Sequence, residues 1–220
     1  MSNCRRVSVD PGAPQRDAIE EAAKWILEDG VVAIPTDTLY GLAANPFSAE
    51  AVARVFAVKG RESERALPLI AADAEQAATY LGRLSDVGQR LAEHYWPGPL
   101  TLLVAAPPAL APDVHGGTGK VGVRVPRDAV ARAICRQAGT PVTATSANIS
   151  GQPATADPAE VERTLGARID LLVDTGKAPG GAPSTIVDTT VMPPALVRAG
   201  AIEWNEIQAW LDNAHPHRPR

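Results

Sequence analysis

The sequence has little of what metal-binding, disulfide-bonded and membrane proteins depend on. Its only two cysteines, Cys4 and Cys135, form no CxxC pair, and its four histidines show no spacing typical of a zinc site. This pattern favours a reducing compartment and no structural metal. No apolar run approaches the ~20 residues that a membrane-spanning helix needs, and the polar N-terminus resembles neither a secretory signal nor a membrane anchor. We therefore expect a soluble, cytoplasmic protein that does not bind membranes.

The chain also lacks an excess of positive charge. Lys and Arg total 21 against 25 Asp and Glu, which argues against a protein that coats nucleic acid through bulk charge but leaves a local basic groove open. Hydrophobic residues make up 45% of the 220, enough for one sizeable core, and no repeat or long linker divides the chain. We expect a single domain over residues 1–212 and a flexible polar tail at 213–220.

Familiar catalytic signatures are missing as well. The stretch from His115 to Lys120 resembles a phosphate loop, but it lacks the first glycine of a Walker A motif and has Val121 where that motif needs serine or threonine. There is no GxSxG motif, and no histidine stands in a nucleophile-and-base arrangement. Cys135 lies on an expected helix among apolar neighbours, which favours an inert core thiol. The sequence offers no candidate for covalent catalysis.

Apolar periodicity indicates strands that alternate with helices. Helices are expected over 15–29, 48–60, 74–95 and 128–138 and from 157 onward, and strands at 31–34, 68–70, 100–105, 121–125, 141–145, 171–173, 184–190 and 195–198. Gly30 is expected to cap the first helix, and residues 107–119 to form a long loop. Because the last three strands follow one another closely, some antiparallel pairing is implied. We expect an α/β fold: a single-domain, open, twisted mixed sheet with flanking helices.

Polar side chains gather at or near strand ends in three stretches, at 35–38, 146–150 and 183–185. In α/β sheets the strand ends form the ligand crevice. Taken singly, each stretch is better explained as a turn, since serine, threonine and asparagine are ordinary turn formers. Lys59 and Arg61 likewise flank the expected end of a helix, where a cation complements the helix dipole without any ligand.

The remaining chemistry consists of cations and neutral polar groups spread along the chain. Phosphoryl transfer requires charge neutralisation and alignment more than a protein nucleophile, so such a set suits it. The cations are Lys59, Arg61, Lys120, Arg124 and Arg198, and the polar groups are Thr38, Ser146, Asn148 and Ser184.

Six motifs, taken together and in order, resemble the YrdC-like family over residues 30–200. They are IPTDTLYGL at 34–42, KGR at 59–61, WPGPLT at 96–101, VRVP at 123–126, SANISG at 146–151 and STIVD at 184–188. Six ordered motifs are far more specific than any one of them. Longer relatives carry a further C-terminal domain, so this chain resembles the short, catalytic-domain-only type.

The resemblance implies the YrdC-like fold and an L-threonylcarbamoyladenylate synthase, a nucleotidyltransferase that joins L-threonine, bicarbonate and ATP and releases pyrophosphate. Its product would supply the threonylcarbamoyl group for modification of a tRNA adenosine, which separate transferase proteins complete. Magnesium would accompany ATP, and contact with tRNA or double-stranded RNA is open. In the implied mechanism the threonine amine captures bicarbonate as a carbamate, whose oxygen attacks the α-phosphorus.

Residue roles are carried over where the motifs align. The carboxylate of threonine would pair with Arg124, whose forked guanidinium suits it. The implied threonine ligands are Thr38, Arg124, Ala144 and Ser184. The implied ATP ligands are Lys59, Arg61, Lys120, Ser146, Asn148 and Arg198, of which Lys59 and Arg61 would also be catalytic.

The chain departs from the family pattern after Arg61, where it reads ESERALP at 62–68 and is about two residues longer. Contacts from that loop are therefore not carried over, although Arg65 is a side chain that could substitute. Two alternatives stay open. One is a carbamoyl-adenylate-forming domain like that of hydrogenase-maturation carbamoyltransferases, although no acylphosphatase or zinc-finger segment is visible. The other is a non-catalytic RNA-binding or ribosome-assembly module, which the acidic balance and the lack of clustered aromatic residues disfavour.

Overall fold

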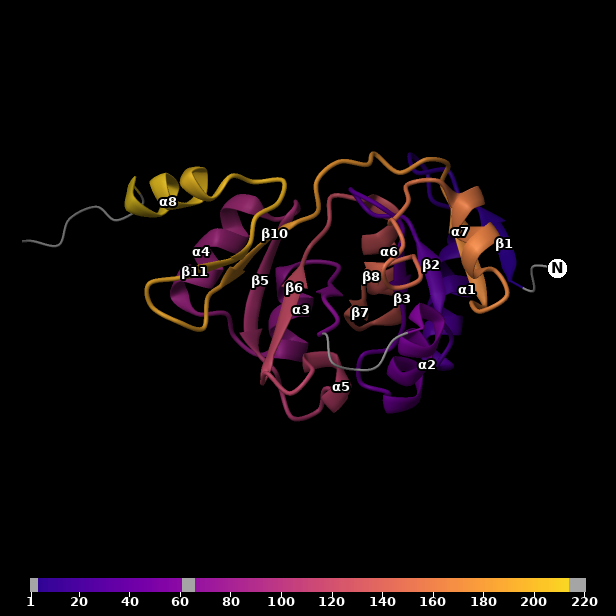
Figure 1. Cartoon of the computed structure of the whole chain (residues 1–220), viewed down its shortest axis with the longest axis horizontal. Coiled ribbons are helices and arrows are strands. Elements are labelled where there is room, and N and C mark those ends of the chain that lie inside the picture. The colour runs from indigo at the N-terminus through magenta and orange to yellow at the C-terminus, as the bar shows by residue number, and fades with distance from the viewer. Residues whose placement is uncertain (1–3, 61–65, 214–220) are drawn as a thin grey trace, which may run out of the picture.

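The structure, a computed structural model of the chain, describes residues 4–60 and 66–213, and its strands form two hydrogen-bonded sheets (Figure 1). The five-stranded sheet has, in spatial order, β1 (Arg5–Ser8), β9 (Leu171–Asp174), β2 (Val32–Ile34), β3 (Gly41–Ala43) and β8 (Thr145–Ser146). The six-stranded sheet has β11 (Ala195–Arg198), β10 (Thr185–Asp188), β5 (Leu100–Ala105), β6 (Lys120–Arg124), β4 (Leu69–Ile70) and β7 (Val142–Thr143). Each sheet mixes parallel and antiparallel pairs, so the predicted mixed α/β class is confirmed.

The two sheets meet at a single short stretch of chain. The expected strand at 141–145 is split into β7 and β8, which belong to different sheets and are separated by Ala144 alone. Thr143 donates its backbone N–H to the carbonyl of Ala44 at 3.0 Å, and Ala144 donates to the carbonyl of Pro68 at 2.8 Å. Residues 142–146 therefore cross from one sheet to the other, and strand ends from both sheets come together there.

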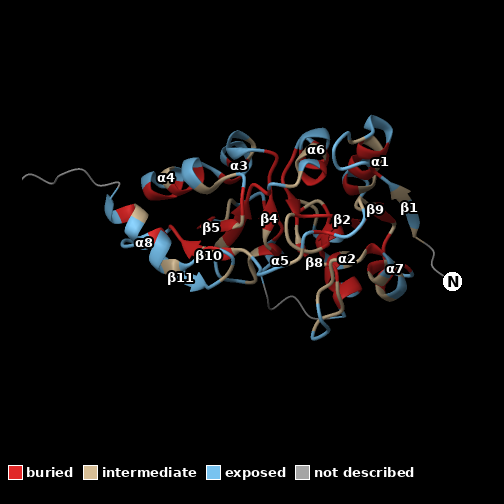
Figure 2. Ribbon diagram, turned by 90° about the horizontal axis from the view of Figure 1, so that it is seen from above, coloured by how far each residue is buried: buried red, intermediate tan, exposed pale blue. Residues whose placement is uncertain are grey.

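Helices cover both faces of the sheets. One side carries α1 (Arg16–Leu27), α3 (Ala74–Leu81), α4 (Asp86–Tyr95) and α6 (Ala129–Ala138), and the other carries α2 (Ala49–Lys59) and α7 (Pro158–Leu165) (Figure 2). The fully buried Leu42 of β3 and Leu102 of β5 belong to one apolar cluster. The two sheets thus share a hydrophobic core, as expected for one domain. A second cluster, which includes Ile26 and Ile134, lies between α1, α6 and the five-stranded sheet.

The end of α1 differs from the prediction. Gly30 is not the left-handed residue; Asp29 is, with φ of 61°. The N–H of Gly30 donates to the carbonyl of Trp25 at 2.7 Å, which is the longer hydrogen bond of a Schellman turn. Glycine is needed at this position for space, because a Cβ there would lie 2.6 Å from the Trp25 oxygen.

Four elements were not predicted: β1, β3, the one-turn helix α5 (Pro112–His115) and α8 (Trp204–Asn213). β1 is polar and mostly exposed, and β3 has only three residues, so neither shows a clear alternation. In α8 the apolar residues Ile207 and Leu211 do recur at helical spacing. Asn213 ends that helix, and residues 214–220 of the expected tail lie outside the described residues. Within 4–60 and 66–213 no helix is long and apolar enough to cross a membrane.

Candidate active site

A cleft of about 550 Å³ lies at the junction of the two sheets. Its walls come from the turn after β2, from β6, from the crossing segment at 144–146, and from both strands of the β10–β11 hairpin. Six of the ten predicted site residues line it: Thr38, Arg124, Ala144, Ser146, Ser184 and Arg198. The fold therefore gathers side chains that are up to 160 positions apart in the chain (38 to 198).

Arg124 reaches the cleft because of the alternation of β6. Val121 and Val123 are fully buried in the core, whereas Gly122 and Arg124 line the cleft from the opposite face of the strand. The Arg124 residue is only 7% exposed. Its Nη1 pairs with Oδ1 of Asp37 on the turn after β2. A buried guanidinium therefore forms one wall of the cleft.

Ser184 and Arg198 form a second polar wall at the open end of the hairpin. Arg198 donates through Nη2 to the carbonyl of Ser184 at 2.7 Å and to its Oγ at 3.1 Å, and this Oγ lies 2.8 Å from Oγ1 of Thr101. Burial lowers the pKa of the Arg198 guanidinium, and the charge of Arg124 lowers it further. Two cations close enough to repel each other favour an anionic ligand between them.

Gly200 makes the close approach at this end of the hairpin possible. A Cβ at Gly200 would lie 2.3 Å from the carbonyl oxygen of Pro183. Ala201 donates to the same oxygen at 2.8 Å, so the chain after β11 is held directly against the residue before Ser184.

Lys59 is brought to the SANISG segment by helix α2. The side chain of Ser48 caps the first turn of α2, and Gly60, with φ of 62°, ends it. Lys59 is 2% exposed, and its Nζ donates to the carbonyls of Ser146 and Asn148 at 2.6 and 3.0 Å. Complementation of the helix dipole does not account for these contacts.

The Asn148 side chain completes this cluster. Its Oδ1 accepts from Lys59 Nζ at 3.0 Å and from Ser146 Oγ at 2.5 Å. Lys59 and Asn148 do not themselves line the cleft, but both contact Ser146, which does. Arg61 and Arg65 lie outside the described residues, so their predicted roles stay predictions.

Lys120 lies apart from the other predicted ligands. It begins β6, four residues before Arg124, which places it about 13 Å away along the strand. Its Nζ pairs with Oδ2 of Asp188 at 2.7 Å, and it is not among the residues that line the cleft. The structure thus does not bring Lys120 together with the rest of the set, and its ATP-binding role stays a prediction.

Several residues of the cleft were not singled out from the sequence. Thr36, Thr101 and Tyr40 line it, and each lies within one of the six motifs. The Tyr40 hydroxyl donates to the carbonyl of Gly176 at 2.8 Å, and burial raises its pKa. It anchors the segment that leads from β9 towards Ser184. The sequence signal that could have identified Tyr40 was an aromatic residue with one polar atom inside a motif.

Cys135 behaves as predicted. It is fully buried, and burial raises the pKa of its thiol to about 12, so it stays protonated at neutral pH. It is therefore not poised as a nucleophile.

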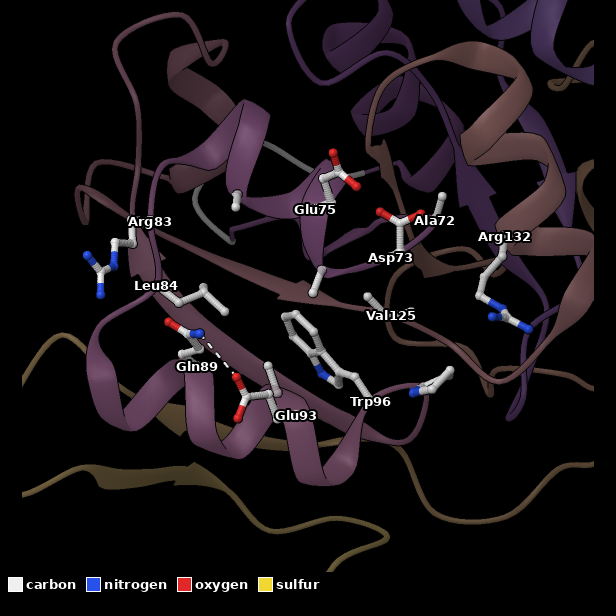
Figure 3. A pocket seen from close by; sticks show the side chains of 14 residues that line it. Ala72, Asp73, Glu75, Arg83, Leu84, Gln89, Glu93, Trp96, Val125 and Arg132 are labelled. Atoms are coloured by element: carbon white, nitrogen blue, oxygen red, sulfur yellow. Dashed lines mark hydrogen bonds between the residues drawn. The ribbon is translucent and has the colours of Figure 1, made fainter.

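A second cavity of about 450 Å³ lies between α3, α4 and α6. Leu84, Trp96 and Val125 form its apolar walls, and charged side chains surround them (Figure 3). Among those charges, Glu93 accepts a hydrogen bond from Gln89 at 3.1 Å. None of the predicted site residues lines this cavity.

The chain is similar to known proteins over most of its length. A family model described as Telomere recombination (Sua5_yciO_yrdC) matches residues 24–200. A threonylcarbamoyl-AMP synthase of Pyrococcus abyssi is 34% identical over 207 residues, which are 92% of this chain and 61% of that protein. One of Bacillus subtilis is 36% identical over 198 residues, or 90% of this chain and 57% of that protein.

A solved structure agrees with these sequence matches. The crystal structure of P. abyssi Sua5 complexed with L-threonine superposes with a TM-score of 0.88 at 33% identity, covering 93% of this chain and 60% of that one. The chain spans about three fifths of the length of these relatives.

Proposed function

The chain belongs to the Sua5/YciO/YrdC family, and on that premise we propose that it is an L-threonylcarbamoyladenylate synthase. The observation that carries this proposal is the convergence of Thr38, Arg124, Ser184 and Arg198 in one cleft beside Ser146. The names of the relatives and the threonine bound to P. abyssi Sua5 support it. The enzyme class is a nucleotidyltransferase, and residues 1–212 act as one catalytic domain.

The end of the cleft with Arg124 and Ser184 binds L-threonine. A guanidinium that is nearly buried binds a carboxylate more strongly than an exposed one, because little water competes for it. Thr38 and Ser184 supply hydroxyls that donate to or accept from the polar groups of the amino acid, and the backbone at Ala144 lines the same space.

The end with Ser146 binds ATP. Lys59 and Asn148 hold Ser146 in place, while Arg198 is available to the phosphates from the hairpin. Arg61 and Lys120 complete the set as proposed ligands. Magnesium enters as part of the substrate Mg-ATP, bound by phosphate oxygens; within the described residues no three His, Cys, Asp or Glu side chains cluster as a metal site.

The reaction needs no covalent enzyme intermediate. The threonine amine attacks bicarbonate and forms a carbamate with loss of water. A carbamate oxygen then attacks the α-phosphorus of ATP, the bond to the β-phosphate oxygen breaks, and pyrophosphate leaves. Lys59 and Arg61 act by orienting and neutralising the reacting phosphate, which is the main requirement of such a displacement.

The proposed product serves tRNA modification. Its threonylcarbamoyl group would pass to a tRNA adenosine through separate transferase proteins, and the proposal places this chain in the cytoplasm, where ATP and tRNA are found. Direct contact with tRNA or double-stranded RNA is not required by the reaction.

The proposal is tested with radiolabelled bicarbonate, L-threonine and Mg-ATP. We expect a labelled adenylate and threonine-dependent release of pyrophosphate. Absence of both products would sink the synthase proposal. An adenylate formed from a labelled carbamoyl donor, supplied with Mg-ATP in place of bicarbonate and threonine, would instead point to the carbamoyl-adenylate reaction. RNA affinity without any adenylate would point to a binding module.

A further inference from the structure

Asp37 is a largely buried carboxylate to which the proposed reaction assigns no role. It lies on the turn between β2 and β3, and its Oδ1 accepts from Nη1 of Arg124. Its Oδ2 accepts from the backbone N–H of Arg127 at 3.3 Å. The side chains of Asp37 and Arg124 are only 11% and 9% exposed. Both oxygens of this carboxylate are therefore engaged by the segment that carries Arg124.

The Asp37 carboxylate of this ion pair lies outside the cavity of the cleft. Thr36, Thr38 and Arg124 line the cleft, but Asp37, between the two threonines in sequence, does not. Asp37 therefore fixes the Arg124 guanidinium from beyond the cavity wall and leaves the cavity-facing edge of the guanidinium available to a ligand. A carboxylate that occupied the cleft itself would compete with that ligand.

The turn that presents Asp37 is held by its neighbours. The hydroxyl of Thr36 donates to the carbonyl of Leu39 at 2.7 Å and accepts from the N–H of Thr38 at 3.2 Å. These bonds hold the backbone of the turn from which Asp37 projects, and they do not involve Arg124.

Arg124 needs such a partner because it is buried beside a second cation. A buried charge without a counter-charge is costly, and the neighbouring charges of Arg124 and Arg198 repel each other. Without Asp37, the guanidinium would turn away from Arg198 or towards water. Either movement removes the two parallel donors that recognise a carboxylate.

We infer that Asp37 is a positioning residue, which holds the Arg124 guanidinium in the orientation that receives the carboxylate of the amino-acid substrate. The identity of that substrate rests on the proposed function. The inference itself concerns only recognition of a carboxylate at this end of the cleft.

The test compares two ligands on purified full-length protein. L-Threonine carries the carboxylate, and L-threonine amide has the same shape without that negative charge. By calorimetry, Asp37→Ala is expected to weaken L-threonine binding about tenfold or more, the loss of one oriented charged contact, with little change for the amide. Asp37→Asn keeps the shape of the side chain and is expected to shift binding in the same direction. In turnover, KM for threonine rises while KM for ATP and kcat change little.

The matched control removes a similar ion pair elsewhere. Asp170 accepts from Nη2 of Arg54 at 2.8 and 2.9 Å, and neither residue lines the cleft. Asp170→Asn is expected to lower Tm without changing the preference for threonine over its amide. This separates lost stability from lost positioning.

Two results would overturn the inference. One is an Asp37→Asn protein, folded by circular dichroism, that keeps the wild-type preference for threonine over the amide. The other is wild-type protein that binds the two ligands equally, because no carboxylate is then recognised. Since binding needs no catalysis, a wild type that prefers threonine but forms no adenylate refutes the proposed function and leaves this inference standing.

Discussion

The two cavities of the protein have similar volumes, about 550 and 450 Å³, but very different walls. The cleft at the sheet junction is lined by two guanidiniums and several hydroxyls from distant segments. The cavity between α3, α4 and α6 has apolar walls around Trp96 and charged side chains about them. Volume alone would not distinguish them, so the site is identified by which polar groups converge.

The two cavities adjoin each other at the end of strand β6. Arg124, the last residue of β6, lines the cleft, whereas Val125, the next residue, lines the second cavity. Successive side chains of an extended chain point to opposite faces, so the two cavities lie on opposite sides of the six-stranded sheet. A change in one can therefore be made without a change in the other.

The largest expected effect comes from Lys59→Ala. The substitution removes the ammonium that donates to Ser146 and Asn148 and, in the proposed function, meets the phosphates. Adenylate formation should fall about 100- to 1,000-fold. Pyrophosphate release measures it, with Lys24→Ala on the exposed face of α1 as a control of equal charge change. Normal turnover in the Lys59→Ala variant would show that Lys59 has no role in the reaction.

One substitution in each cavity tests whether the cleft alone takes part in the reaction. Ala154 lines the cleft, and Ala78 lines the second cavity. Ala154→Leu fills space that a substrate needs and should raise the KM values or lower kcat by about tenfold. Ala78→Leu should leave initial rates within about twofold. Equal losses in both variants would mean that the second cavity also takes part in the reaction.

A smaller effect is expected from Ser184→Ala. It removes the hydroxyl that contacts Thr101 and Arg198 and should raise KM for threonine about five- to tenfold, as expected for one hydrogen bond in a buried site. KM for ATP should stay unchanged in the same steady-state assay. The exposed Ser8→Ala on β1 serves as the control. A change in the KM for ATP alone would assign Ser184 to the ATP-binding end of the cleft.

The smallest effect concerns a pair that lines neither cavity. Burial by itself would raise the pKa of the Asp188 carboxyl, but hydrogen bonds from Lys120 and Thr190 outweigh it and the pKa is lowered. A lowered folded-state pKa stabilises the protein above the ordinary aspartate range, and this contribution is lost as the pH falls through the folded-state pKa. Asp188→Asn should cost on the order of 1 kcal/mol at pH 7 and less at pH 3.

Urea unfolding at the two pH values measures this difference. Asp86→Asn is the control, because its carboxylate is 95% exposed and its contact with Arg83 is 3.6 Å long. If Asp188→Asn destabilised the protein as much at pH 3 as at pH 7, the predicted loss of this stabilisation at low pH would be contradicted.

Local signals predicted much of the secondary structure. The helices expected to begin near Ser48 and Asp157 and the strand expected at 121–125 appear in the structure, because each depends on residues within one turn or strand. The prediction at Gly30 was wrong because asparagine and aspartate also adopt the left-handed conformation, and Asp29 does so here. β3 was missed because three residues are too few to show the alternation of apolar and polar residues that predicts a strand.

The site was predictable as a set of residues but not as a geometry. Thr38, Arg124, Ser184 and Arg198 were chosen from motifs, and they meet in the cleft. Lys120 was chosen in the same way, yet it pairs with Asp188 at the other end of β6. Asp37 lay within a quoted motif, but only its contact with Arg124 gives it a role. Which motif residues touch is a matter of long-range pairing that no local pattern encodes.

The sequence by itself determined the α/β class, most of the elements and the chemical character of the site, because periodicity, capping and side-chain type are local properties. The tertiary structure alone decided that the strand at 141–145 divides between two sheets, that the cleft opens at Ala144, and that Asp37 is held against Arg124. Those features depend on contacts between residues more than 70 positions apart, and such contacts exist only once the chain has packed around its common core.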